Sequence, residues 1–186
     1  MPEPKFQKLG PEGLCVINRD LFKDERGQFS KMFSSETLAQ AGWNKLIAQV
    51  NHSHTIGRGT VRGLHFQYPP HQEMKLVSCI RGEVWDVAVD LRASSATYLK
   101  WTAQILSAEN GCSLLIPEGM AHGFQTLSGE AELIYCHSAP WVKDSEGGLN
   151  AADPALAITW PLVVSLRSQK DATLPFLDQN FKGINL

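Results

Sequence analysis

The sequence lacks the features that mark membrane-spanning, secreted and nucleic-acid-binding proteins. No apolar run approaches the ~20 residues that cross a bilayer, and residues 1–7 are polar and contain prolines, unlike the apolar centre of a signal peptide. The four cysteines are widely spaced without a CxxC pair, which predicts reduced, buried thiols. Basic residues are scattered and the net charge is -2, which argues against a nucleic-acid surface. We expect a cytoplasmic protein with no nucleic-acid or membrane partner.

The chain also lacks a Gly/Ser-rich or charge-rich linker that would divide it. Its 186 residues are 43% hydrophobic and 19% charged, close to an ordinary globular protein. A single domain over residues 1–186 is therefore expected.

Helical periodicity is scarce, and short strand-like runs dominate. One helix is predicted at 34–42, with Ser34 as its N-cap and Gly42 as its stop, and a short helix is expected in the loop-rich part after residue 140. Residues 22–27 are expected to form a turn and residues 55–60 a glycine-rich loop. Residues 84–91 alternate as a strand with one packed and one solvent-facing side does. Strands are predicted at 14–17, 28–33, 46–52, 75–80, 84–91, 101–106, 113–116, 123–127 and 131–137, and from 61 onward. This spacing favours an antiparallel sandwich or barrel.

A glycine and proline pattern narrows the fold class. Gly111, Pro117, Gly119 and His122 match most of the second motif of cupins. We therefore predict an all-β cupin, a double-stranded β-helix or jelly-roll barrel with a few short helices, with His122 pointing inward.

The first cupin motif needs a His-x-His pair to bind metal, but the chain reads His65-Phe66-Gln67. His71 and Glu73 are two further potential ligands in a loop, whereas a catalytic metal needs three convergent protein ligands. No bound metal is expected.

Three basic side chains are predicted to meet in the mouth of the barrel. Arg62 precedes His65 by three residues, and Lys75 lies on the next predicted strand. A lone histidine on an apolar strand is usually a core residue, but three neighbouring cationic groups repel one another without an anionic partner. A phosphorylated or nucleotide-linked substrate would supply that partner.

Several segments together resemble the dTDP-4-dehydrorhamnose 3,5-epimerases. The resemblance covers about residues 22–179, and its segments are residues 62–67, 69–71, 75–77, 82–92, 107–110, 116–119 and 121–124. It implies a cupin without metal or cofactor that inverts C3 and C5 of a 4-keto-6-deoxyhexose. The substrate would be a nucleoside-diphosphate sugar, dTDP-4-dehydro-6-deoxy-D-glucose, and the product dTDP-4-dehydro-L-rhamnose, a precursor in deoxysugar and O-antigen biosynthesis.

The resemblance implies catalytic roles for four residues. His65 would be the base, Asp171 the carboxylate that orients it, and Tyr135 the acid on the opposite face of the sugar. Lys75 would stabilise the developing O4 oxyanion. The ketone of the substrate is itself the electron sink, so no cofactor is required.

The resemblance also implies binding residues and a homodimer. N-terminal strands of one subunit would complete the site of the other, with Arg26 and Phe29 acting across the interface. Substrate contacts are expected from Arg26, Phe29, Gln49, Asn51, Arg62, His122, Trp141, Glu146 and Lys170.

Three departures from the family pattern leave alternatives open. Lys31 stands where a glutamate is common, Pro140 replaces the first of two aromatics, and residues 136–139 differ from the usual run. These changes are compatible with an enzyme that inverts only C3 or only C5, or that uses another nucleotide sugar. A non-catalytic sugar-binding cupin and a metal-dependent cupin are the alternatives from other classes.

Overall fold

The computed structural model describes residues 5–186, which form short strands with few helices. The helices are α1 (Ser35–Gln40), α2 (Gln169–Ala172) and the 3₁₀ helix η1 (Lys143–Ser145). The strands are β1 (Lys5–Lys8), β2 (Cys15–Asn18), β3 (Phe22–Asp24), β4 (Gly27–Phe29), β5 (Gln49–Ile56), β6 (Val61–Gln67), β7 (Lys75–Arg81), β8 (Glu83–Asp90), β9 (Trp101–Ser107), β10 (Cys112–Ile116), β11 (Met120–Thr126), β12 (Glu130–His137) and β13 (Glu146–Gly148).

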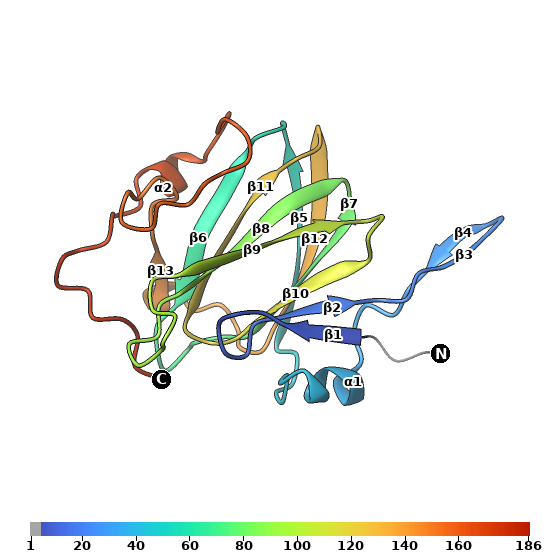
Figure 1. Ribbon diagram of the computed structural model, residues 1–186, viewed down its shortest axis with the longest axis horizontal. Coiled ribbons are helices and arrows are strands. Elements are labelled where there is room, and N and C mark those ends of the chain that lie inside the picture. The colour runs from blue at the N-terminus through green and yellow to red at the C-terminus, as the bar shows by residue number, and fades with distance from the viewer. Residues whose placement is uncertain (1–4) are drawn as a thin grey trace.

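Two antiparallel sheets face one another (Figure 1). The first has six strands in the order β1-β2-β10-β7-β12-β5, and the second has five in the order β13-β6-β11-β8-β9. This is the jelly-roll barrel of cupins, and the all-β prediction is confirmed. A third, two-stranded sheet, the β3–β4 hairpin, projects away from the barrel (Figure 1).

The inward face of β12 passes from an apolar core into a polar region. Ala131 and Leu133 are fully buried in a cluster to which both sheets contribute, while Tyr135 and His137 continue the same alternation into a pocket. Strand β7 passes in the opposite direction, from the polar pocket at Lys75 to the apolar core at Val77. The core therefore fills one part of the barrel and leaves the other open for polar side chains.

The prediction that β8 has one solvent-facing side is wrong. Asp86 and Asp90 are both 0% exposed. Val84 and Ala88 pack into the core between the sheets, whereas Val87 and Val89 pack under the C-terminal segments. Because both faces of β8 are covered, its alternation separates two buried environments.

The helix prediction is confirmed, and the strands around it are shifted. Ser34 caps α1 by accepting a hydrogen bond from the backbone of Thr37, and Gly42 follows the helix at φ +103°. The predicted turn at 22–27 is instead the β3–β4 hairpin, and the predicted strand at 28–33 ends at Phe29. Strand β5 runs to Ile56 rather than ending near residue 52, because it pairs along the whole of β12.

Two predictions about excluded features can be compared with the described residues. All four cysteines are buried and free, as predicted. Within residues 5–186, no helix is long and apolar enough to cross a membrane.

Candidate functional site

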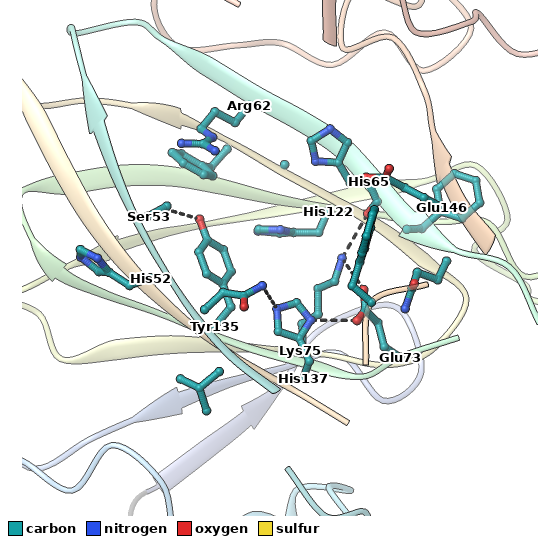
Figure 2. A pocket seen from close by; sticks show the side chains of 17 residues that line it. His52, Ser53, Arg62, His65, Glu73, Lys75, His122, Tyr135, His137 and Glu146 are labelled. Atoms are coloured by element: carbon teal, nitrogen blue, oxygen red, sulfur yellow. Dashed lines mark hydrogen bonds and ion pairs between the residues drawn. The ribbon is translucent and has the colours of Figure 1, made fainter. Parts of the chain in front are cut away.

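A cavity of ≈ 470 Å³ opens between the two sheets (Figure 2). Strands β6 and β11 supply one wall, with Arg62, His65 and His122. Strands β5, β7 and β12 supply the facing wall, with Lys75 and Tyr135 among others. The cavity therefore collects basic and hydroxyl side chains from both sheets.

His65 is held by Asp171, which comes from a distant part of the chain. The side chain of His65 is 35% exposed, and its Nε2 lies 2.8 Å from Oδ1 of Asp171. Helix α2, capped by Ser168, presents Asp171, whose second oxygen accepts the backbone N–H of Gly63 at 3.2 Å. The contact at Nε2 leaves Nδ1 as the ring nitrogen that can accept a proton.

Electrostatics keeps Asp171 ionised. Burial acts to raise the pKa of Asp171, but the hydrogen bonds from His65 and Gly63 outweigh it and hold the pKa below its ordinary value. An ionised Asp171 stabilises a protonated His65, as a base requires.

Tyr135 projects from the wall opposite His65 (Figure 2). Burial raises the pKa of Tyr135 well above its ordinary range, and the hydrogen bond with Ser53 only partly opposes this. The phenol therefore remains protonated at neutral pH. Its oxygen lies 2.9 Å from the hydroxyl of Ser53 on β5, a residue that the sequence analysis did not identify.

Lys75 is buried and paired with Glu73. Its Nζ lies 3.1 Å from Oε1 of Glu73 and donates to the backbone carbonyl of His65 at 3.3 Å. The other oxygen of Glu73 lies 2.8 Å from Nδ1 of His137. Glu73 was considered from the sequence only as a potential metal ligand, and His137 was not identified as functional, although it shares the inward face of β12 with Tyr135.

His122 lines the cavity, so its predicted inward orientation is confirmed. A carboxylate holds its ring in place. Both oxygens of Asp86 contact Nε2 of His122, at 3.0 and 2.9 Å. Burial raises the pKa of Asp86, and the contact with His122 opposes that shift. Asp86 was not identified as a candidate, because β8 was expected to turn this side toward solvent.

The remaining predicted binding residues lie at the rim of the cavity or away from it. Asn51, Trp141 and Glu146 line the cavity, and Gln49 contacts both Asn51 and the backbone of Trp141. Lys170 is exposed and forms an ion pair with Glu146 at 2.8 Å.

Arg26 and Phe29 do not reach this cavity. Both lie on the projecting β3–β4 hairpin, where Phe29 is 57% exposed and Arg26 forms an ion pair with Asp24 on the same hairpin. Within one chain, the structure therefore separates these two predicted binding residues from the others.

The region that would hold a metal in other cupins is organised differently. Among residues 5–186, no group of three or more His, Cys, Asp or Glu side chains is arranged to hold a metal ion. Gln67 instead donates to the carbonyls of His71 and Pro140 and accepts from the backbone of Val142. Its side chain thus ties together two loops beside the cavity.

Comparison with known proteins gives one consistent family. The family model described as dTDP-4-dehydrorhamnose 3,5-epimerase matches residues 8–179. The curated dTDP-4-dehydrorhamnose 3,5-epimerase of Shigella flexneri is 45% identical over 85% of this chain and 87% of its own length. That of Sinorhizobium fredii is 40% identical over 95% and 91%.

A solved structure agrees with these relatives. It is the dTDP-6-deoxy-D-glucose-3,5-epimerase of Legionella pneumophila in complex with dTDP-4-keto-L-rhamnose. It superposes with a TM-score of 0.91 at 35% identity and covers 98% of both chains.

Proposed function

The chain belongs to the dTDP-4-dehydrorhamnose 3,5-epimerase family, and on this premise we propose that it inverts C3 and C5 of a nucleotide-linked 4-keto-6-deoxyhexose. It is an isomerase, and its substrate is dTDP-4-dehydro-6-deoxy-D-glucose, which it converts to dTDP-4-dehydro-L-rhamnose. The reaction changes the configuration at two carbons that flank the ketone and transfers no group.

The observation that carries the proposal is the arrangement of His65, Tyr135 and Lys75 around one cavity, with Asp171 behind His65. The His65–Asp171 pair lies on one wall, Tyr135 projects from the facing wall, and the ammonium of Lys75 lies in the same cavity. Inversion at carbon needs a base and an acid on opposite faces of the sugar. Two facing sheets supply these positions.

Each inversion is a pair of proton transfers. His65 takes the proton from the carbon next to the ketone, and the electrons of the broken C–H bond move onto O4 to form an enolate. Lys75 stabilises the charge on O4. The phenol of Tyr135 then delivers a proton to the other face of the carbon, and the electrons of the enolate return to form the new C–H bond.

Proton exchange with solvent resets the site. After each inversion His65 carries an extra proton and Tyr135 lacks one. The hydroxyl of Ser53 lies 2.9 Å from the phenol oxygen, which supports Ser53 as the donor that stabilises the phenolate until it is reprotonated. The same two groups then act on the second carbon.

The anionic nucleotide is recognised by the cationic rim and the partner subunit. We assign the phosphates and sugar to Arg62, Asn51, His122, Glu146 and Lys170, and the thymine ring to Trp141, supported by Gln49. Arg26 and Phe29 would come from the projecting hairpin of a second subunit in a homodimer. We further infer that residues 1–186 act as one domain in the cytoplasm.

Proton NMR in D2O tests the proposed function directly. Purified protein is mixed with dTDP-4-keto-6-deoxyglucose, and the C3 and C5 proton signals are followed. Both signals are expected to disappear while the product of inversion accumulates. Loss at only one carbon would replace the proposal with a C3-only or C5-only epimerase. Absence of exchange at both would refute it and favour another nucleotide sugar or a binding role.

A further inference from the structure

A chain of hydrogen bonds crosses the floor of the cavity and ends on Glu73. The backbone of Trp141 donates to Gln49 at 3.0 Å, and the amide of Gln49 donates to Asn51 at 2.9 Å. Asn51 donates in turn to Nε2 of His137 at 3.3 Å. Nδ1 of His137 lies 2.8 Å from Oε2 of Glu73 (Figure 2).

The direction of donation fixes the tautomer of His137. Asn51 uses its oxygen to accept from Gln49, so its NH2 group faces His137. Nε2 of His137 must then accept and Nδ1 must carry the hydrogen that Glu73 receives. These contacts fix the orientation of the His137 ring, with Nδ1 as the donor and Glu73 as the acceptor at the end of the chain.

Glu73 receives a second, stronger contact from the other side. Nζ of Lys75 lies 3.1 Å from Oε1, and the side chains of Glu73 and Lys75 are each only 9% exposed. Burial acts to raise the pKa of Glu73, but the hydrogen bond from His137 and the charge of Lys75 outweigh it and lower the pKa below its ordinary value. A buried ammonium is costly without a paired carboxylate, and the ionised Glu73 is that partner for Lys75.

We infer that Glu73 and His137 are positioning residues for Lys75: Glu73 holds the ammonium charged and in place beneath the substrate, and His137 holds Glu73. The inference rests on the proposed function, in which Lys75 stabilises the O4 oxyanion. His137 lies directly across from Lys75 in the β12–β7 register, so the pairing of these two strands brings His137 and Lys75 together. Neither residue touches the reacting atoms.

Glu73→Gln is the first test, because it removes the charge and keeps the shape. We expect kcat to fall about tenfold and KM to stay within about twofold, since ground-state binding is not removed. The alkaline limb of the kcat profile should move to lower pH by about one unit or more, because a buried ammonium without its counter-ion loses its proton more readily. The titratable and charged groups that line the cavity with Lys75 are His52, Arg62, His65, Glu73, His122, Tyr135, His137 and Glu146, and Asp86 faces it from β8.

The matched control is Glu130→Gln. Glu130 also contacts a histidine, His54 at 2.9 Å, and a cation, Arg81, but lies outside the cavity. The kinetics and pH profile of Glu130→Gln should match those of the wild type. A wild-type kcat and alkaline limb in Glu73→Gln would overturn the inference.

Two substitutions at His137 test whether it acts through Glu73. His137→Leu removes the donor and should lower kcat about threefold to tenfold, whereas His137→Asn keeps an amide donor near the position of Nδ1 and should recover most of the loss. Glu73→Gln with His137→Leu should be no worse than Glu73→Gln alone, because the two residues act as one unit. If the losses of kcat were additive in the double variant, or equal in the two His137 variants, His137 would not act through Glu73. The two single His137 variants test the inference even if Glu73→Gln does not fold.

A readout without substrate separates this inference from the proposed function. ¹⁵N NMR of histidine-labelled protein, assigned with His137→Asn, should show His137 as the neutral tautomer protonated at Nδ1. A charged ring or the Nε2-protonated tautomer would overturn the hydrogen-bond chain. If the wild type instead shows this tautomer but exchanges no substrate protons, the proposed function fails and Lys75 has no oxyanion to stabilise.

Discussion

His65 and His122 are partners across the β6–β11 register, and each has a carboxylate on its Nε2. The side chain of His65 is 35% exposed and that of His122 is 7% exposed. The pKa of Asp171 lies below its ordinary value because its hydrogen bonds outweigh burial, whereas burial raises the pKa of Asp86. The greater exposure of His65 and its ionised carboxylate partner therefore favour His65 over His122 as the base in the proposed mechanism.

Substitution at His65 and Tyr135 separates proton removal from inversion. His65→Ala should abolish deuterium incorporation at both carbons, with a loss of at least about 100-fold. Tyr135→Phe should retain some incorporation but lose inversion, because the proton can return only to the face from which it left. Proton NMR in D2O measures both quantities. His54→Ala is the matched control, since His54 lies outside the cavity. Near-normal exchange in His65→Ala would identify a different base.

At the scale of elements, β8 and the segment that follows it depend on a buried aspartate. Asp90 ends β8 and accepts hydrogen bonds from the guanidinium and backbone of Arg92 and from the hydroxyls of Ser95 and Thr97. Burial acts to raise the pKa of Asp90, but these bonds outweigh it and lower the pKa to about 2. The carboxylate thus holds the turn between β8 and β9 in place.

Asp90→Asn should therefore lower stability in a pH-dependent way. Because the pKa is depressed in the folded state, the stabilisation is present above the ordinary aspartate pKa of about 3.9 and amounts to about 2 kcal/mol. It is lost as pH falls through the folded value of about 2. Urea unfolding of both proteins between pH 7 and pH 2 measures the difference. If the difference in unfolding free energy between the two proteins stayed constant from pH 7 to pH 2, this account would be contradicted.

The contact between β6 and β11 requires glycine at position 63. Gly63 has φ +106°, and a Cβ there would lie 2.6 Å from the carbonyl oxygen of His122 and 2.7 Å from Cα of Gly123. Gly63→Ala should cost at least about 2 kcal/mol of unfolding free energy, from strain and the clash with backbone. Gly129→Ala is the control, because a Cβ there meets nothing within 4 Å. Equal stability of both variants in urea unfolding would show that the strands separate without cost.

At the scale of the whole molecule, the β3–β4 hairpin projects away from its own barrel (Figure 1). All six residues of its two strands are exposed, and Phe22 and Phe29 pack mainly against each other, with ring centroids 6.5 Å apart. Exposed aromatic residues on a projecting hairpin are typical of a segment that contacts a partner. In the proposed homodimer that partner is a second copy of the chain.

Complementation between inactive variants tests this exchange. Neither His65→Ala nor the double variant Arg26→Ala with Phe29→Ala should be active alone. In a mixed dimer, one site would combine an intact His65 with an intact hairpin from the other subunit. Equal mixing after dissociation should restore about one quarter of wild-type activity, because half of the dimers are mixed and each has one good site. No recovery, with mixed dimers verified by native mass spectrometry, would place the hairpin in its own subunit's site.

Local patterns in the sequence were enough to establish the all-β class, helix α1 with Ser34 and Gly42 at its ends, and the inward position of His122. These depend on turn chemistry, capping and period-two alternation, which act over a few residues. The family resemblance added the pairing of His65 with Asp171, which local pattern alone could not provide over 106 residues.

Which sides of the strands are buried, and which polar groups meet, depends on how the strands pair and the sheets pack. Alternation shows that a strand has two sides but not what covers each, so one side of β8 was expected in solvent, whereas Asp86 and Asp90 on that strand are both buried. Glu73 and His137 lie 64 residues apart and meet because β12 pairs with β7. Local patterns in the sequence indicated most of the strands and the side chains that they carry, because alternation and turn residues act over a few positions. Strand pairing and sheet packing, which are long-range and depend on the whole chain, decided which of those groups share a cavity.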